Sequence, residues 1–244
     1  YEIPLRLVGS EMCIRDSDAE YGLAHVLNAL LKLEYKDFLG AQRELETNLK
    51  NGNNDNFTLI SLATVYRELS MFEKAEKTIK KVIERNSDSL NYQCQLAEIY
   101  IAEKKYDDAL NLVEKVLAQN ENYITAYTTG AKATFAKNDL TSTKDYAQKA
   151  ISLDMNYSGG YFYLAMVRFA EKDYDEAIEC MKRAIMFDVN NAEYYAKMSD
   201  IYKAKEDFKT ALDYIKEAES ISENTEYKLK YKELAALNLS LIHI

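Results

Sequence analysis

The chain has 244 residues, with 31 Lys and Arg against 40 Asp and Glu, which gives a formal net charge of −9. Hydrophobic residues make up 48% and charged residues 29%, a composition typical of a folded globular protein. The negative balance disfavours nucleic-acid binding, which needs clustered Lys and Arg. No apolar stretch approaches the roughly 20 residues of a membrane-spanning helix. With 7 Gly and one Pro, Pro4, the chain has so few helix breakers that we expect an all-α fold.

The two ends of the chain look foreign to the rest. Residues 7–17 resemble a translated transposon-type sequencing adapter, and residues 239–244 resemble the reverse complement of the same adapter. We therefore expect residues 1–17 and 239–244 to be adapter-derived and the genuine insert to span residues 18–238. On this hypothesis the insert is a metagenomic fragment open at both ends, and deleting both ends should leave the melting temperature nearly unchanged.

From Gly22 onward the sequence repeats every 34 residues. A pair of apolar or small residues recurs at this interval, as Leu62-Ala63, Leu96-Ala97, Gly130-Ala131, Leu164-Ala165 and Met198-Ser199. Small residues recur at a fixed distance after each pair: Ala75, Ala109, Thr143, Ala177 and Ala211. This periodicity is typical of repeat architectures. It defines six repeats, numbered 1 to 6 below, at 22–55, 56–89, 90–123, 124–157, 158–191 and 192–225, with a partial seventh beginning near Glu226.

Each repeat has the pattern of a helical hairpin. In repeat 5, residues spaced three and four apart form apolar stripes over 161–165 and 177–184, and a polar break separates them. Asp173 and Glu176 have the spacing of a capping box, which predicts the start of the second helix. At the end of the repeat, Asn191 is placed to cap the next helix.

This pattern resembles the tetratricopeptide repeat family across residues 22–225. The resemblance rests on the paired residues, the recurring alanines and large side chains four positions into several repeats, namely Leu59, Tyr127, Tyr161 and Tyr195. It implies a right-handed α-α superhelix, a solenoid of about six helical hairpins.

Two features depart from the family pattern. The family's usual proline near the end of each repeat is replaced by Ser87, Glu121, Met155, Val189 and Glu223. Repeat 4 carries Gly130, Thr134 and Thr143 at packing positions and is followed by Ser158-Gly159-Gly160. We expect the softest junction of the array there, although glycine can equally be tolerated at a turn between repeats.

The insert lacks the residue sets that catalysis or metal binding requires. His25 is its one histidine, and we expect it to pack rather than act as a base. Cys94 and Cys180 lie in different repeats, which excludes a CxxC motif and weakly favours a reducing, cytoplasmic location. The polar run at 51–56 lacks the closing Glu of a calcium loop and is better explained as a turn between repeats. We therefore expect no enzyme activity, no metal and no cofactor.

Binding is the function that remains. In the family, the first helices of the hairpins line a concave groove. The groove positions of this chain lack the Lys and Asn pattern of the carboxylate clamp, so a chaperone carboxylate tail is disfavoured as a ligand. The resemblance and the apolar row along consecutive repeats point to a candidate peptide-binding groove of nine residues: Ile101, Thr128, Lys132, Phe135, Phe162, Met166, Phe169, Asp200 and Lys203. The helix that carries Phe162 is apolar nearly all round, so either neighbouring repeats or a partner should cover it.

The sequence therefore predicts a bacterial protein-interaction scaffold that binds a peptide or protein segment with apolar anchors. Two alternatives stay open. The fragment could be the recognition arm of a larger enzyme, such as a glycosyltransferase or a signalling kinase, whose catalytic domain is missing. It could also be a self-assembling array that pairs with further copies through its groove or its ends.

Overall fold

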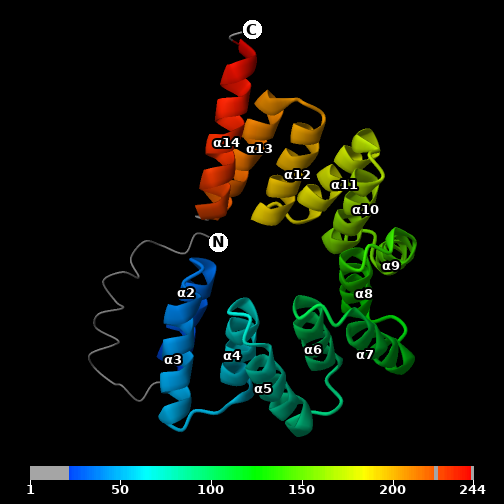
Figure 1. The fold of residues 1–244 in the computed structure, drawn as a ribbon. Helices are drawn as coiled ribbons and strands as arrows, with labels where there is room; N and C mark the ends of the chain where they lie inside the picture. Colours follow the sequence, from blue (N-terminus) through cyan, green and yellow to red (C-terminus); the bar gives the residue numbers. More distant parts are fainter. Residues whose placement is uncertain (1–21, 223–224, 243–244) are drawn as a thin grey trace. The chain divides into compact units, whose positions relative to one another are not determined.

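The computed structural model describes residues 22–222 and 225–242, with side chains up to residue 238. Within these ranges the chain forms 13 helices and no strand. They are α2 (Gly22–Glu34), α3 (Phe38–Lys50), α4 (Asn56–Glu68), α5 (Phe72–Arg85), α6 (Leu90–Ala102), α7 (Tyr106–Gln119), α8 (Ile124–Ala136), α9 (Leu140–Leu153), α10 (Ser158–Ala170), α11 (Tyr174–Phe187), α12 (Ala192–Ala204), α13 (Phe208–Ile221) and α14 (Thr225–Ile242). Figure 1 shows consecutive helices lying side by side as hairpins.

The helices group into two compact parts. The N-terminal part contains α2–α5 and ends at Ser87, and the C-terminal part contains α6–α14 and begins at Asp88. In both parts each repeat holds two helices, which begin at the first and the seventeenth position of the 34-residue unit. The predicted fold class, an all-α solenoid of helical hairpins, is confirmed.

The turn inside every hairpin has the same left-handed backbone conformation. The residue at position 15 of each repeat has a φ between 56° and 66°: Lys36, Ser70, Lys104, Asn138, Lys172 and Glu206. In repeat 5 the amide of Lys172 donates to the carbonyl of Phe169, and the amide of Asp173 donates to that of Arg168. These two bonds form a Schellman motif, which satisfies the last carbonyls of the first helix. Glycine usually occupies this position, and this chain uses none there.

Aspartate begins most of the second helices. The side chains of Asp37, Asp139, Asp173 and Asp207 each accept a hydrogen bond from the backbone amide three residues later. The cap predicted at Asp173 is therefore confirmed. The cap predicted at Asn191 is wrong, because this side chain instead donates to the carboxylate of Asp188 at 3.0 Å and makes no capping bond.

The core of each hairpin consists of small side chains between the two helices. Ala165 and Ala177, which we expected to permit close approach, are both fully buried. They belong to one apolar cluster with Met181, Ala184 and Met198, so repeat 5 is packed against repeat 6 as well as within itself. Alanine at these positions lets two helix backbones approach without a void.

Repeat 4 replaces this apolar contact with a hydroxyl relay. Thr143 on α9 donates to the hydroxyl of Thr134 on α8 at 3.0 Å, and Thr134 donates to the carbonyl of Gly130 at 2.9 Å. Both threonines are buried, and their polar groups are satisfied. Gly130 makes room for the ring of Tyr146, since a Cβ atom there would lie 2.8 Å from that ring. Gly130, Thr134 and Thr143, the residues by which repeat 4 departs from the family pattern, therefore all contact other residues of the same hairpin.

Gly160 also has a packing role, at the junction that we expected to be soft. It is buried, and a Cβ atom at this position would lie 2.6 Å from Cγ1 of Ile151 and 3.1 Å from the carbonyl oxygen of Ala147. The glycine therefore lets α10 lie directly against α9. Close packing here argues against a soft junction.

Tyrosine hydroxyls join consecutive repeats at the position where the family carries proline. Tyr127, Tyr161 and Tyr195 each donate to the carbonyl six residues earlier, that of Glu121, Met155 and Val189, at 2.8, 3.1 and 3.2 Å. These three bonds recur every 34 residues in the C-terminal part. They hold the turn between two repeats without a proline.

The adapter-like ends lie largely beyond what the structure describes. Residues 1–17 and 243–244 fall outside the described residues, while 239–242 continue the backbone of α14. That helix begins at Thr225, and its Leu234 is buried among side chains of α12 and α13. Helix α14 thus packs on repeat 6 as the first helix of the partial seventh repeat.

Candidate functional site

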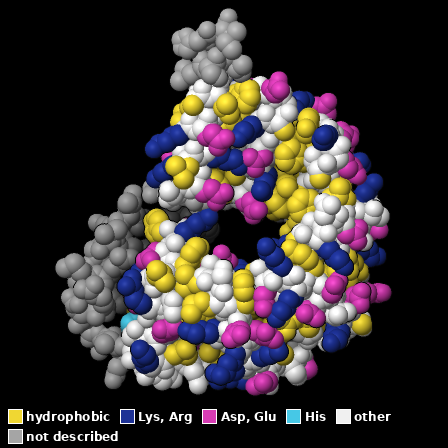
Figure 2. Space-filling view, viewed as in Figure 1, with side chains coloured by type: hydrophobic (Ala, Val, Ile, Leu, Met, Phe, Trp, Pro, Cys, Tyr) yellow, Lys and Arg dark blue, Asp and Glu magenta, His cyan; other side chains and the backbone are white. Residues whose placement is uncertain are grey.

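The predicted groove residues all lie on the first helices of four consecutive repeats in the C-terminal part. Ile101 is on α6, Thr128, Lys132 and Phe135 are on α8, Phe162, Met166 and Phe169 are on α10, and Asp200 and Lys203 are on α12. Helix α8 contacts both α6 and α10, so these helices form one row. Figure 2 shows hydrophobic side chains gathered over the α10–α12 segment, with charged side chains around them.

The apolar members of the set are mostly used for packing. Ile101, Phe162 and Met166 are each only 8% exposed. Phe162 stacks on Tyr194 of α12 with ring centroids 5.0 Å apart. Neighbouring repeats thus cover much of the apolar surface of α10. The sequence had left open whether neighbouring repeats or a partner would cover it. Phe135 and Phe169 are half-buried and pack at the edge of the same cluster, so they are the accessible part of the apolar row.

The charged members form ion pairs between neighbouring first helices. Lys132 lies 3.7 Å from Glu98 on α6, and Lys203 lies 2.8 Å from Glu233 on α14. Asp200 lies 2.5 Å from Lys230 of α14. These pairs link consecutive repeats and balance the charge along the row, so the set does not present an excess of one sign.

Tyr163 is a member of this surface that the sequence did not single out. It follows Phe162 on α10, with the two rings edge to face at 5.1 Å. Burial, together with the nearby carboxylates of Glu193 and Glu98, raises the pKa of the Tyr163 hydroxyl far above its usual range. This hydroxyl has no hydrogen-bond partner among the described residues, although its side chain is half-buried. It is a donor beside Phe162, one of the residues predicted to line the groove.

Two further tyrosines frame this position. The hydroxyl of Tyr157 lies 3.4 Å from that of Thr128, and the hydroxyl of Tyr194 lies 3.2 Å from that of Ser158. The ring of Tyr157 also runs close to Gly159, where a Cβ atom would lie 3.1 Å away. Phenol rings combine an apolar body with a polar tip, so this face can contact both apolar and polar parts of a peptide.

Sequence comparison identifies the repeats. The tetratricopeptide repeat family matches residues 58–89, 158–191 and 192–225, which follow the bounds of repeats 2, 5 and 6. These three segments are tetratricopeptide repeats. No curated protein matches the sequence significantly.

Solved structures of tetratricopeptide repeat proteins share the fold. The chain is similar to TTC0263, a thermophilic TPR protein in Thermus thermophilus, with a TM-score of 0.66 at 15% identity over 73% of this chain and 97% of that one. The APC/C hetero-tetramer Cut9-Hcn1 gives a TM-score of 0.63 at 14% identity over 94% of this chain and 46% of that one. PilF of Pseudomonas aeruginosa gives 0.53 at 17% identity over 88% and 96%. These likenesses concern the fold alone.

His25 serves a structural purpose in repeat 1. Its Nδ1 atom lies 2.9 Å from Glu44 on α3, and Asn28 and Lys32 of α2 bind the same carboxylate at 2.9 and 2.8 Å. This network joins the two helices of the hairpin. No group of three or more His, Cys, Asp or Glu side chains within the described ranges is arranged to hold a metal ion.

The two cysteines of the repeats are poor nucleophiles. Burial raises the pKa of the Cys94 thiol to about 11, and burial also raises the pKa of Cys180. Because the thiolate is the reactive form, both thiols are protonated at neutral pH and unreactive. Among the helices that the structure describes, none is long and apolar enough to span a membrane.

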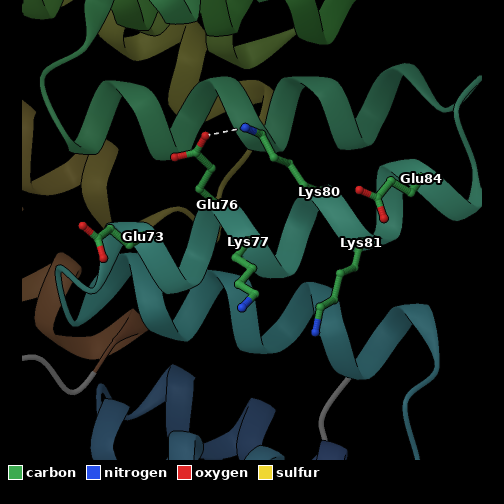
Figure 3. Close-up of a pocket in the computed structure, with 6 residues that line it drawn as sticks. All are labelled: Glu73, Glu76, Lys77, Lys80, Lys81 and Glu84. Carbon is green, nitrogen blue, oxygen red and sulfur yellow. Dashed lines mark hydrogen bonds and ion pairs between the residues drawn. The ribbon is translucent and has the colours of Figure 1, made fainter.

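A depression on α5 is lined only by charged side chains. It has a volume of about 420 Å³ and is bordered by Glu73, Glu76, Lys77, Lys80, Lys81 and Glu84. Figure 3 shows Glu76 and Lys80 facing each other, and they are paired at 2.6 Å. Ligand pockets are mostly apolar, with a few polar groups. This depression on the second tetratricopeptide repeat is therefore a solvated helix face.

Proposed function

We propose that this protein is a non-catalytic scaffold that binds an extended or helical protein segment along the first helices α8, α10 and α12 of its C-terminal part. Tetratricopeptide repeats support a role in protein interaction. The observation that carries the finer assignment is Tyr163, whose side chain is half-buried and whose hydroxyl lacks a hydrogen-bond partner among the described residues. The hydroxyl still reaches solvent, because Oε2 of Glu103 is the fully buried side-chain atom that lacks a partner among the described residues. A bound peptide carbonyl would replace water as the acceptor of this hydroxyl.

The chemistry of the face favours a segment with apolar anchors and a polar backbone contact. Phe135 and Phe169 offer half-buried rings at the edge of the apolar cluster. The flanking ion pairs, Lys132 with Glu98 and Asp200 with Lys230, leave no net charge to select an acidic tail. Helix-in-groove and extended-peptide recognition both use such a surface.

The test begins with peptides selected from a displayed random library on the immobilised protein. Their affinities are then measured by titration calorimetry for the wild type and for Tyr163→Phe. This change removes the hydroxyl alone, so we expect affinity to fall about tenfold, the value of one hydrogen bond, while the melting temperature stays the same.

The matched control is Tyr35→Phe, which removes a hydroxyl from an exposed tyrosine that directly follows α2 in the N-terminal part. It should leave affinity unchanged. Peptides that bind equally well to both variants and to the wild type would show that the ligand lies elsewhere, and the groove assignment would then be wrong. Phe162→Ser is unsuitable as a site test, because this ring is stacked in the core and its loss would destabilise the fold.

A further inference from the structure

Three tyrosines, one from each of repeats 4, 5 and 6, gather near Phe162 in the C-terminal part. The ring of Phe162 lies edge to face with that of Tyr163 at 5.1 Å and stacks on that of Tyr194 at 5.0 Å. Tyr157 directly precedes α10, and its hydroxyl lies 3.4 Å from that of Thr128. Tyr157 and Tyr163 are half-buried, so part of each side chain is accessible. Tyr157, Tyr163 and Tyr194 are named the tyrosine cluster below.

Other tyrosine rings of the C-terminal part already hold cations. The ammonium of Lys105 lies 5.9 Å from the ring centroid of Tyr100, and the guanidinium of Arg183 lies 5.6 Å from that of Tyr161. The face of an aromatic ring attracts a cation because the π system carries negative charge density there. Among the described residues, no Lys or Arg lies over a ring of the tyrosine cluster. The cluster therefore has ring surface that a cation of a partner can contact.

Two carboxylates lie close to the tyrosine cluster, that of Glu98 on α6 and that of Glu193 on α12. Burial raises the pKa of the Tyr163 hydroxyl, and the charges of Glu193 and Glu98 raise it further, so both carboxylates lie near this hydroxyl. Glu98 has Lys132 at 3.7 Å. Glu193 is exposed in the first turn of α12 and forms no ion pair with any residue that the structure describes. Glu193 is thus the carboxylate that is available to a partner.

The formal charge of the chain is concentrated in the C-terminal part. Residues 22–87 carry 10 Lys and Arg against 9 Asp and Glu, whereas residues 88–238 carry 19 Lys and Arg against 26 Asp and Glu. The two segments therefore have net charges of +1 and −7. A negative charge of this size attracts cationic segments and repels acidic ones over about 10 Å at moderate salt.

We propose that the tyrosine cluster seats a basic side chain of the partner segment, with the cation against the rings of Tyr157 and Tyr163 and paired with Glu193. This inference rests on the proposed function, because it names a residue that the bound segment brings to this face. Arginine suits the cluster better than lysine, since its planar group stacks on a ring and donates two hydrogen bonds to one carboxylate. The Tyr163 hydroxyl stays available to a carbonyl of the same segment.

The first test uses the full chain and the peptides selected from the displayed random library. We expect arginine or lysine to be enriched at one position of these peptides, next to an apolar residue. Replacing that basic residue by glutamine should weaken binding about tenfold in titration calorimetry, because the change removes both the ion pair and the contact between cation and ring.

The second test changes the protein. Glu193→Gln should weaken binding of the basic peptide about fivefold and leave the melting temperature unchanged, since this side chain is exposed. It should not affect binding of the glutamine-substituted peptide, because both changes remove the same contact. The matched control is Glu217→Gln, at an exposed carboxylate on the second helix α13, which alters the net charge equally and should leave affinity unchanged.

Two outcomes would overturn the inference: selected peptides that contain no basic residue, or a basic peptide that binds Glu193→Gln and Glu217→Gln with equal affinity. Either outcome leaves the proposed function standing if binding still weakens in Tyr163→Phe and the peptide slows hydrogen exchange in α8, α10 and α12. Binding that is insensitive to Tyr163→Phe, with protection only in other helices, would instead refute the proposed function and the inference together.

Discussion

Glu44 joins the two helices of the first hairpin through three side chains of α2. His25, Asn28 and Lys32 all lie within 2.9 Å of its carboxylate oxygens. Burial on its own would raise the pKa of this carboxyl, but the hydrogen bonds from Lys32 and His25 outweigh it and lower the pKa below the usual 4.5. The ionised form is therefore the one that the folded protein stabilises.

We predict that Glu44→Gln destabilises the N-terminal part by about 1 kcal/mol at pH 7. The pKa of Glu44 is lower in the folded protein than in the unfolded chain. The stability that ionised Glu44 contributes is therefore complete above its unfolded pKa and is lost as the pH falls through its folded pKa. Urea melts at several pH values should show a gap between wild type and variant at pH 7 that closes in acid. Glu34→Gln, at an exposed residue of α2, serves as the control. A gap of constant size down to pH 3 would contradict this account.

The tyrosine bonds between repeats allow a second prediction at the residue scale. Tyr161→Phe removes the hydroxyl that donates to the carbonyl of Met155 and keeps the ring, which lies 5.6 Å from that of Phe187. We expect a loss of about 0.5–1 kcal/mol. The same change at Tyr127 and Tyr195 should add to it, since separate sites contribute independently. Chemical denaturation of the single and triple variants measures this, and a triple variant as stable as the wild type would refute it.

Among the structural elements, the turn inside each hairpin has a strained backbone, because a residue other than glycine adopts a positive φ at position 15. Lys172 has a φ of 64° and is exposed, with no ion pair described for it. Non-glycine residues adopt this conformation at a cost, whereas glycine does not. Lys172→Gly should therefore stabilise the protein by about 0.5–1 kcal/mol.

The matched control for this turn is Lys182→Gly, in the middle of α11, which should instead cost about 1 kcal/mol because glycine lowers helix propensity. Asn138→Gly should gain less than Lys172→Gly, since asparagine tolerates a positive φ. Thermal melts of the three variants decide the matter. Destabilisation by Lys172→Gly would mean that the turn carries no strain.

The junction between α9 and α10 provides the opposite case, in which glycine is needed. We predict that Gly160→Ala costs about 1–2 kcal/mol although alanine favours helices, because its Cβ would meet Ile151 and the carbonyl of Ala147. Gly159→Ala meets only side-chain atoms at 3.1 Å and should be nearly neutral. If both changes were neutral in denaturation experiments, the packing role of Gly160 would be lost and the junction would be soft after all.

Several elements could be predicted from the sequence because they depend on local, periodic signals. The helix starts follow the 34-residue register, and the Asp173 cap follows from its spacing to Glu176. The sequence could not show that Asn191 fails to cap its helix, because its side chain instead donates a hydrogen bond to the carboxylate of Asp188. The roles of Gly160 and of the relay between Thr134 and Thr143 were also hidden, because they depend on residues brought together only by packing.

At the scale of the whole molecule, the candidate site was predictable only in outline. The register placed the nine groove residues on the first helices correctly, because helix faces follow from periodicity. The sequence could not show that Phe162 and Met166 are covered by neighbouring repeats, nor that the hydroxyl of Tyr163 has no hydrogen-bond partner among the described residues. Those properties arise from the contact of repeats, and a solenoid is held together by such contacts between neighbours.

The proposed function requires a partner segment to lie along the first helices of the C-terminal part. The most direct measurement is amide hydrogen exchange of the full chain with and without a library-selected peptide at saturating concentration. We expect slower exchange in α8, α10 and α12, with little change in the second helices α9, α11 and α13. Protection confined to the second helices or to the N-terminal part, at full occupancy, would contradict it.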